Sequence, residues 1–157
     1  MTGKSAGSFW RSILRRRYLS REDEKAVVMA IGEAEKGNRG EVRVHVEASS
    51  PGEDPLNRAA ALFGELGMGR TAEGTGVLLY VAVRDRRAAV YAGPGIHGAA
   101  DKGFWQDTVN AVAGGFAAGE PAHGITLALE KIGTLLRTTV PGDDKSGNEL
   151  PDEVTQS

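Results

Sequence analysis

The sequence predicts an α/β fold, a three-layer α/β/α sandwich in which a small mixed β-sheet is flanked by helices. Stripes of apolar residues at helical spacing alternate with short β-rich segments along the 157 residues. The segment 77–83 is apolar throughout, which is typical of a central strand covered on both faces. The short turn 84–87 then leads into a second strand, 88–92, so the two are expected to pair as an antiparallel hairpin.

The first predicted helix begins at Ser20, whose hydroxyl can cap it, and ends at Gly37. The segment 41–47 follows and alternates strictly between valine and polar residues, as a strand does. We expect one buried face and one face that is wet or only partly covered, as near a sheet edge. The polar residues of this strand are Glu41, Arg43, His45 and Glu47.

The second predicted helix has Asp54 at its cap and Pro55 at its first helical position, and Gly67 ends it. This helix connects strand 41–47 to strand 77–83. A helical crossover of this kind joins parallel strands and is right-handed, so we expect these two strands to be parallel.

Two more helices are predicted after the hairpin. Asp101 can cap the first of them, and Gly119 with Pro121 separates it from the last. The order of elements is therefore helix, strand, helix, strand, strand, helix, helix. This order is that of a mixed sheet with helices on both faces.

The net charge of -2 conceals two ends of opposite sign. The first 20 residues contain five basic and no acidic side chains, whereas residues 141–157 contain five acids and one lysine. We divide the chain into a basic amphipathic arm (1–18), an α/β domain (19–140) and an acidic tail (141–157) that we expect to be disordered. The near-neutral charge predicts no nucleic-acid partner.

Residues 9–18 combine aromatic and aliphatic side chains with arginines at helical spacing. This segment can make peripheral contact with an anionic membrane, or it can dock on the surface of its own domain. We favour docking, because four apolar residues give weak membrane binding. An apolar run long enough to span a bilayer and a secretory signal are both missing, so we expect a cytoplasmic protein.

The composition excludes several kinds of chemistry. The chain has no cysteine, so disulfides, thiol nucleophiles and cysteine-ligated metals are impossible. The three histidines lie far apart in the sequence, without the spacing of a helical metal motif. The glycine-rich segment 69–76 follows a helix and opens a strand, which is the wrong order for a phosphate loop. We expect no organic cofactor, and carboxylate chemistry remains.

Asp54 follows the first strand and Asp85 the second, and ligands of open α/β sheets bind beyond the carboxyl ends of parallel strands. Asp101 comes from the segment after the hairpin, which can fold back towards the same edge. Several carboxylates together would suit Ca²⁺ or Mg²⁺. The alternative roles are structural, with Asp54 and Asp101 as helix caps and Asp85 as a turn former.

The glycine loop 93–98 contains His97, and such loops let the backbone approach a ligand closely. Its candidate ligand-contacting residues are Gly93, Gly95 and Ile96. The alternative is a plain connection between a strand and a helix.

These segments together resemble the TPM-domain family, the thylakoid acid-phosphatase-like proteins and their bacterial relatives. The resemblance runs from Leu19 to Arg137 and is carried by the order and spacing of several motifs. The motifs are residues 39–46, Asp54-Pro55, 67–69 with 76–81, 85–87, 93–97 and Phe104-Trp105. The tail 148–154 is also similar to an ending in the bacterial members without a membrane anchor.

The resemblance implies a three-layer α/β sandwich, divalent-cation binding and a phosphatase activity. It carries over most readily to Asp85 and the loop 95–97, although many membrane-linked relatives have an acidic residue where this chain has His97. Two functions follow. In the first, the chain is a cation-binding or interaction module that works beside a membrane-associated protein in envelope or photosystem maintenance. In the second, it is a metal-assisted acid phosphatase, with Asp85 as a ligand and His97 as general acid or base.

Overall fold

A computed structural model describes residues 18–50, 52, 54–71, 73–143 and 154–157. The predicted N-terminal arm lies outside these residues except for Tyr18, and so does most of the predicted tail. The elements, in chain order, are α2 (Arg21–Glu35), β1 (Glu41–Glu47), α3 (Pro55–Glu65), η1 (Met68–Arg70), β2 (Gly76–Ala82), β3 (Arg87–Ala92), α4 (Pro94–His97), α5 (Lys102–Ala117), α6 (Pro121–Thr139) and β4 (Val154–Gln156).

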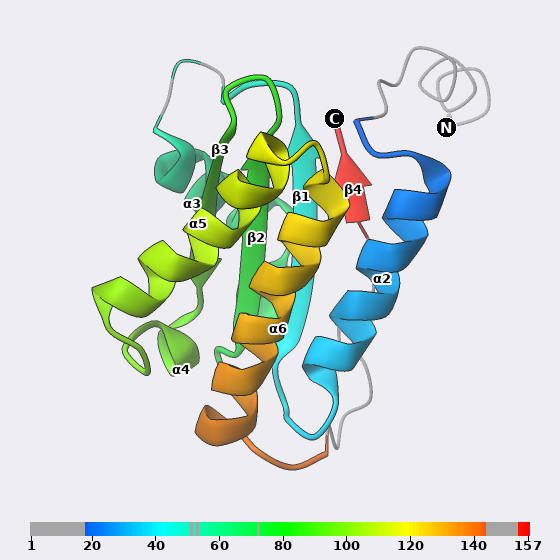
Figure 1. The fold of residues 1–157 in the computed structure, drawn as a ribbon. Helices are drawn as coiled ribbons and strands as arrows, with labels where there is room; N and C mark the ends of the chain where they lie inside the picture. Colours follow the sequence, from blue (N-terminus) through cyan, green and yellow to red (C-terminus); the bar gives the residue numbers. More distant parts are fainter. Residues whose placement is uncertain (1–17, 51, 53, 72, 144–153) are drawn as a thin grey trace, which may run out of the picture.

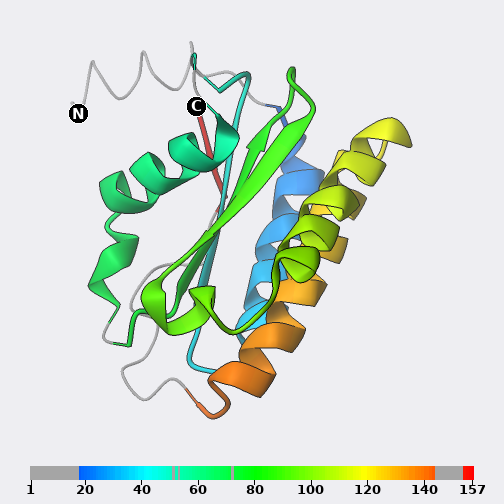
Figure 2. The same ribbon diagram turned by 90° about the vertical axis from the view of Figure 1, so that its left-hand side faces the viewer.

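The strands form one mixed sheet in the order β3-β2-β1-β4 (Figure 1). Strand β1 is parallel to β2 and to β4, and β2 is antiparallel to β3. Helices α2, α5 and α6 cover one face of the sheet, whereas α3 and η1 cover the other (Figure 2). The predicted three-layer α/β sandwich, its parallel crossover and its hairpin are therefore confirmed.

Local capping explains where two of the helices begin. The Ser20 hydroxyl accepts the Asp23 N–H at 3.0 Å, and the Asp101 carboxylate accepts the Phe104 N–H at 2.8 Å. Each bond satisfies one of the backbone donors that a helix start leaves without a partner. Helix α3 differs, because Asp54 makes no capping bond and Pro55 starts the helix by its fixed φ alone.

The alternation of side chains along β1 and β2 divides the interior into two apolar cores. One core lies between the sheet and helices α2, α5 and α6, and the other lies beneath α3. The strand residues of the first core are Val42, Val44, Val46, Val77, Leu79 and Val81, and those of the second core from β2 are Leu78, Tyr80 and Ala82. The continuous apolar run of β2 is therefore required, since both of its faces are covered.

Strand β1 corrects one prediction. All seven of its residues are buried, so its polar face is neither wet nor half-covered. The reason is its position, because β1 pairs with β2 on one side and with β4 on the other. At the end of the tail, which we expected to be mostly disordered, Val154–Gln156 form a strand that the sequence analysis did not predict. Three residues are too few for a period-2 pattern to be recognised in a sequence.

Helices α5 and α6 approach each other closely at two glycines. A Cβ atom on Gly115 would lie 2.7 Å from the Gly124 Cα, and one on Gly124 would lie 2.7 Å from the Ala111 carbonyl oxygen. Both distances are too short for a side chain, so the crossing requires glycine at these positions. Among the described residues, no helix is long and apolar enough to cross a membrane.

We expect Gly115→Ala to lower the free energy of unfolding by about 1–3 kcal/mol, because the added methyl forces two backbones apart. The neighbouring Gly114→Ala is a matched control, since its Cβ meets nothing within 4 Å. This control should stabilise the chain by about 0.5–1 kcal/mol through helix propensity. Urea denaturation measures both, and equal effects of the two variants would contradict the close crossing.

Candidate functional site

Two of the predicted acids lie at the carboxyl edge of the parallel strands. Asp85 is exposed in the β2–β3 turn, where its Oδ2 accepts the Ser50 N–H at 2.9 Å. Asp54 is exposed before α3, with its Oδ1 3.8 Å from Nη2 of Arg87. As expected for acids that follow neighbouring parallel strands, both lie at the same edge of the sheet.

His97 lies at the opposite end of the strands, beyond the amino-terminal end of β2. Strand β3 runs antiparallel to β2, so its last residue, Ala92, pairs with Val77 at the start of β2. His97 follows this end of β3, whereas Asp85 precedes the other end. Six residues of strand separate them, on the order of 20 Å. The two residues predicted for catalysis are therefore not brought together.

The glycines of the 93–98 loop pack against the chain's own backbone. A Cβ on Gly93 would lie 2.5 Å from the Gly74 carbonyl oxygen, and one on Gly95 would lie 2.4 Å from that of Glu73. The Gly95 N–H also donates to the Gly74 carbonyl at 2.9 Å. Ile96 is fully buried in the core. The close approach predicted for this loop therefore serves packing against segment 73–74.

The carboxylates do not form a metal cluster. The Asp101 carboxylate caps α5, and Asp85 is held by the Ser50 amide. Across the described ranges, no three histidine, aspartate or glutamate side chains are grouped so as to hold a metal ion. Ca²⁺ takes six to eight oxygen ligands. Asp54 and Asp85 alone do not complete such a site.

A buried polar network that the sequence analysis missed lies on the α3 side of the sheet. We call it the Glu47 network, and its centre is the carboxylate at the end of β1. Arg58 of α3 donates to both oxygens of Glu47, at 2.9 and 3.0 Å, and the Tyr80 hydroxyl donates at 2.5 Å. The Ser157 hydroxyl donates at 3.1 Å. The members of the Glu47 network are His45, Glu47, Arg58, Tyr80, Thr155 and Ser157.

His45 connects the network to the last strand. Its Nε2 lies 2.9 Å from the Ser157 Oγ, and its Nδ1 lies 2.5 Å from the Thr155 Oγ1. The single proton of the Ser157 hydroxyl goes to Glu47, so this hydroxyl accepts from Nε2–H of the imidazole. The Thr155 hydroxyl also lies 3.5 Å from the Val44 carbonyl oxygen, to which it donates. His45 is therefore bonded through both of its ring nitrogens to the C-terminal segment.

The pKa shifts in the network follow from its contacts. Burial raises the pKa of the Glu47 carboxyl, but hydrogen bonds from Arg58, Tyr80 and Ser157 outweigh it and hold this pKa at about 2. Burial and the bond to Glu47 raise the pKa of the Tyr80 hydroxyl. Burial lowers the pKa of His45, against the attraction of Glu47. At neutral pH the network therefore holds a carboxylate, a neutral phenol and a neutral imidazole.

The Glu47 network is built to join elements. Its side chains come from β1, β2, α3 and the C-terminal segment, and Glu47, His45 and Tyr80 are at most 6% exposed. Both carboxylate oxygens are engaged, which leaves no free group for a substrate. The feature that could have revealed this network is the pairing of β1 with its two neighbours. His45 lies opposite Tyr80 of β2 on one side and opposite Thr155 of β4 on the other.

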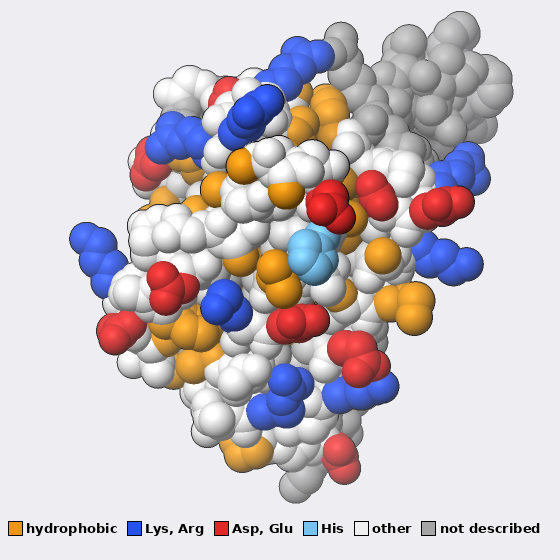
Figure 3. All heavy atoms as spheres, in the orientation of Figure 1, with side chains coloured by type: hydrophobic (Ala, Val, Ile, Leu, Met, Phe, Trp, Pro, Cys, Tyr) orange, Lys and Arg blue, Asp and Glu red, His pale blue; other side chains and the backbone are white. Residues whose placement is uncertain are grey.

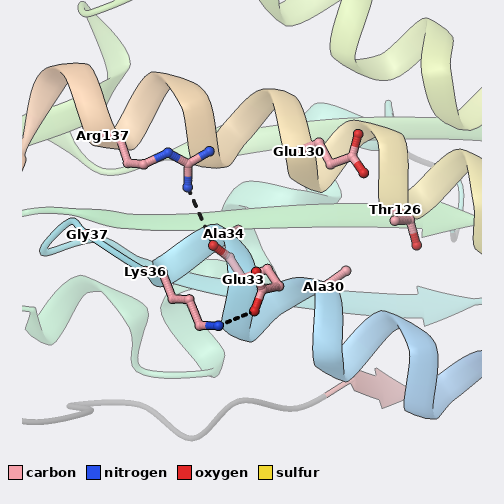
Figure 4. A pocket seen from close by; sticks show the side chains of 8 residues that line it. All are labelled: Ala30, Glu33, Ala34, Lys36, Gly37, Thr126, Glu130 and Arg137. Atoms are coloured by element: carbon pink, nitrogen blue, oxygen red, sulfur yellow. Dashed lines mark hydrogen bonds and ion pairs between the residues drawn. The ribbon is translucent and has the colours of Figure 1, made fainter.

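Surface grooves also lie between the helices and beside the sheet. One of them, with a volume of about 510 Å³, lies between α2 and α6. Its charged walls are largely engaged, because Lys36 pairs with Glu33 and Arg137 donates to the Glu33 carbonyl (Figure 4). A second groove of about 410 Å³ lies between α5 and α6, and a third of about 230 Å³ lies beside β3. On the helical face, acidic, basic and apolar side chains are interspersed (Figure 3).

A family model described as the TPM domain matches residues 15–135. The chain belongs to the TPM-domain family. The solved structure of the BA42 protein from the psychrophilic bacterium Bizionia argentinensis is similar to this TPM domain, with a TM-score of 0.80 and 36% identity. The match covers 91% of this chain and 98% of BA42. The resemblance found in the sequence is thereby confirmed.

Two further solved structures share the fold. The N-terminal domain of the cg2496 protein from Corynebacterium glutamicum has a TM-score of 0.60 and 15% identity, covering 80% of this chain and 79% of that domain. The N-terminal domain of a protein from P. gingivalis has a TM-score of 0.65 and 19% identity, covering 78% of each chain. No protein of curated function matches this TPM domain significantly.

The stability of this TPM domain should decrease when the pH is lowered far enough to protonate Glu47. Its folded pKa of about 2 lies below the ordinary glutamate value of 4.5, so its contribution to stability is complete above pH 4.5 and is lost as the pH falls towards 2. The loss amounts to about 3 kcal/mol at most. Urea denaturation at a series of pH values measures it.

In Glu47→Gln this part of the pH dependence should disappear, and the variant should be less stable at neutral pH because Arg58 loses its anionic partner. Asp107→Asn, which changes an exposed acid of α5, is the control and should retain the wild-type profile. An unchanged slope in Glu47→Gln would contradict the assignment.

Proposed function

We propose that this TPM domain is a non-catalytic interaction module that binds a protein partner. The observation that supports this proposal is the separation of Asp85 and His97, which lie at opposite ends of the β2–β3 hairpin. A metal-assisted phosphatase that uses Asp85 as a metal ligand and His97 as general acid or base needs both groups close to one substrate. The family resemblance implies that the partner is a membrane-associated protein.

The buried polar groups support the same proposal. Glu47, His45 and Tyr80 are the described side chains with shifted pKa values that resemble catalytic groups, and all three are covered and hydrogen-bonded within the domain. Perturbed pKa values mark structural ion-pair networks as well as active sites. Here the four hydrogen bonds that Glu47 accepts account for the lowered pKa of its carboxyl.

Hydrolysis of an aryl phosphate tests the proposal against the alternative, a metal-assisted acid phosphatase. With Mg²⁺ or Ca²⁺ present, we expect the purified chain to show no turnover above that of buffer. The decisive variant is Asp85→Asn, which keeps an acceptor for the Ser50 N–H. Turnover that collapses in Asp85→Asn, but persists in the control Glu130→Gln, would establish the phosphatase and overturn the interaction module.

A divalent cation at the carboxyl edge stays a prediction. It is favoured by the placement of Asp54 and Asp85 at the ends of neighbouring parallel strands, although these two acids do not complete a site. Asp101 and the 93–98 loop belong to the same prediction. Any such cation would bind through oxygen ligands, as Ca²⁺ and Mg²⁺ do.

Titration with CaCl₂ or MgCl₂, followed by amide NMR, tests this prediction. A cation at the carboxyl edge should shift the amides around Asp54 and Asp85, and Asp85→Asn should abolish these shifts while Glu130→Gln retains them. Shifts that also include 93–101 would extend the site to the opposite edge. If millimolar metal moves none of these amides, the cation site is wrong.

A further inference from the structure

Strand β3 leaves one edge of the sheet open. It stands at the end of the strand order, and within the described residues no further strand pairs with its outer side. The Gly93 N–H donates to the Gly76 carbonyl, which sets the alternation along the β2–β3 ladder. Residues 87, 89 and 91 therefore bond to β2, and the backbone groups of Ala88 and Val90 point to the open side.

A groove runs along this open edge between the two helical layers. Its floor is formed by Arg87, Ala88, Ala89 and Val90 of β3, with α3 on one side and α5 on the other. The walls contribute the apolar side chains of Leu56, which is 48% exposed, and Trp105. An extended chain lying here would meet backbone partners below and apolar surface on both flanks.

The charges at the groove favour an acidic occupant. Its charged lining residues are Asp54, Arg87 and Lys102. Asp54 and Arg87 lie 3.8 Å apart and offset each other. Lys102 makes no ion pair with any of the residues that the structure describes, so the groove has one basic group in excess.

We propose that the groove along β3 binds an extended, acidic peptide segment of a partner protein, which adds to the sheet as a further strand. Backbone hydrogen bonds to Ala88 and Val90 supply affinity without regard to sequence, as in other cases of strand addition. The contact with Lys102 supplies the preference for acidic side chains. This inference rests on the proposed interaction module and specifies the chemistry of its partner.

The test uses the full chain and synthetic octapeptides that alternate valine with glutamate, with threonine or with lysine. In amide NMR titrations, the glutamate peptide should shift the signals of Ala88, Val90 and the Trp105 indole, and should bind at least 5-fold more tightly than the lysine peptide. If no peptide moves these signals at millimolar concentration, or if the shifts map elsewhere, the groove is not a peptide site.

Two pairs of variants separate the backbone and charge contributions. Val90→Pro removes an N–H that faces the open edge, so it should abolish binding without breaking the β2–β3 ladder. Val90→Ala keeps this N–H and should bind within about 3-fold of the wild type. Lys102→Glu should reverse the preference in favour of the lysine peptide. The control Lys131→Glu, the same charge change on α6, should leave the preference unchanged.

Equal preferences in Lys102→Glu and the wild type would overturn the acidic specificity. The other candidate occupant of the groove is a second copy of this chain, and sedimentation of the chain without peptide tests for it. A dimer that Val90→Pro dissociates would mean that a second copy of this chain fills the groove, which overturns the proposed partner. The phosphatase assay distinguishes the two proposals, because absent peptide binding with absent turnover refutes the groove alone.

Discussion

The charge of Glu47 is the constraint on which the α3 side of the sheet depends. A carboxylate that is 6% exposed needs several hydrogen bonds, because burial without them costs more than a domain of this size can offset. Its partners come from α3, from β2 and from the C-terminal segment. Four parts of the chain, separated by up to 110 residues, are therefore joined at one carboxylate.

The Glu47 network also explains the place of the last strand. Strand β4 has three residues, too few to hold itself in the sheet by backbone pairing alone. The side chains of Thr155 and Ser157 bond to His45, and Gln156 accepts the backbone N–H groups of Tyr18 and Leu19 at 2.8 and 3.1 Å. One face of β4 is thus held to β1, and the other is held to the segment that leads into α2. The two edges of the sheet then differ, since β4 is short and anchored whereas β3 has backbone groups directed to an open groove.

Local patterns predicted the fold well because each signal acts within a few residues. The caps at Ser20 and Asp101 formed as expected, and the apolar run of β2 is covered on both faces. The candidate site was less predictable. Asp54 and Asp85 share an edge because strand direction decides it, but His97 follows an antiparallel strand and so ends at the opposite edge. The glycines at 93 and 95 indicated a close approach correctly, without indicating that the neighbour is the backbone of residues 73–74.

The sequence by itself determined the class of fold, the family, the crossover from β1 to β2 and the restriction to oxygen and imidazole chemistry. The fold class, the crossover and the restriction in chemistry follow from composition and from periodicity, whereas the family follows from the resemblance of several motifs to those of its members. None of these needs knowledge of distant contacts. Only the tertiary structure decided that the polar face of β1 is buried, that Val154–Gln156 form a strand and that Asp85 and His97 lie apart. The physical reason is that burial and hydrogen bonding depend on which segments meet. The local sequence predicts a solvated side chain for Glu47, whereas Arg58, Tyr80 and Ser157 surround its carboxylate in the folded domain.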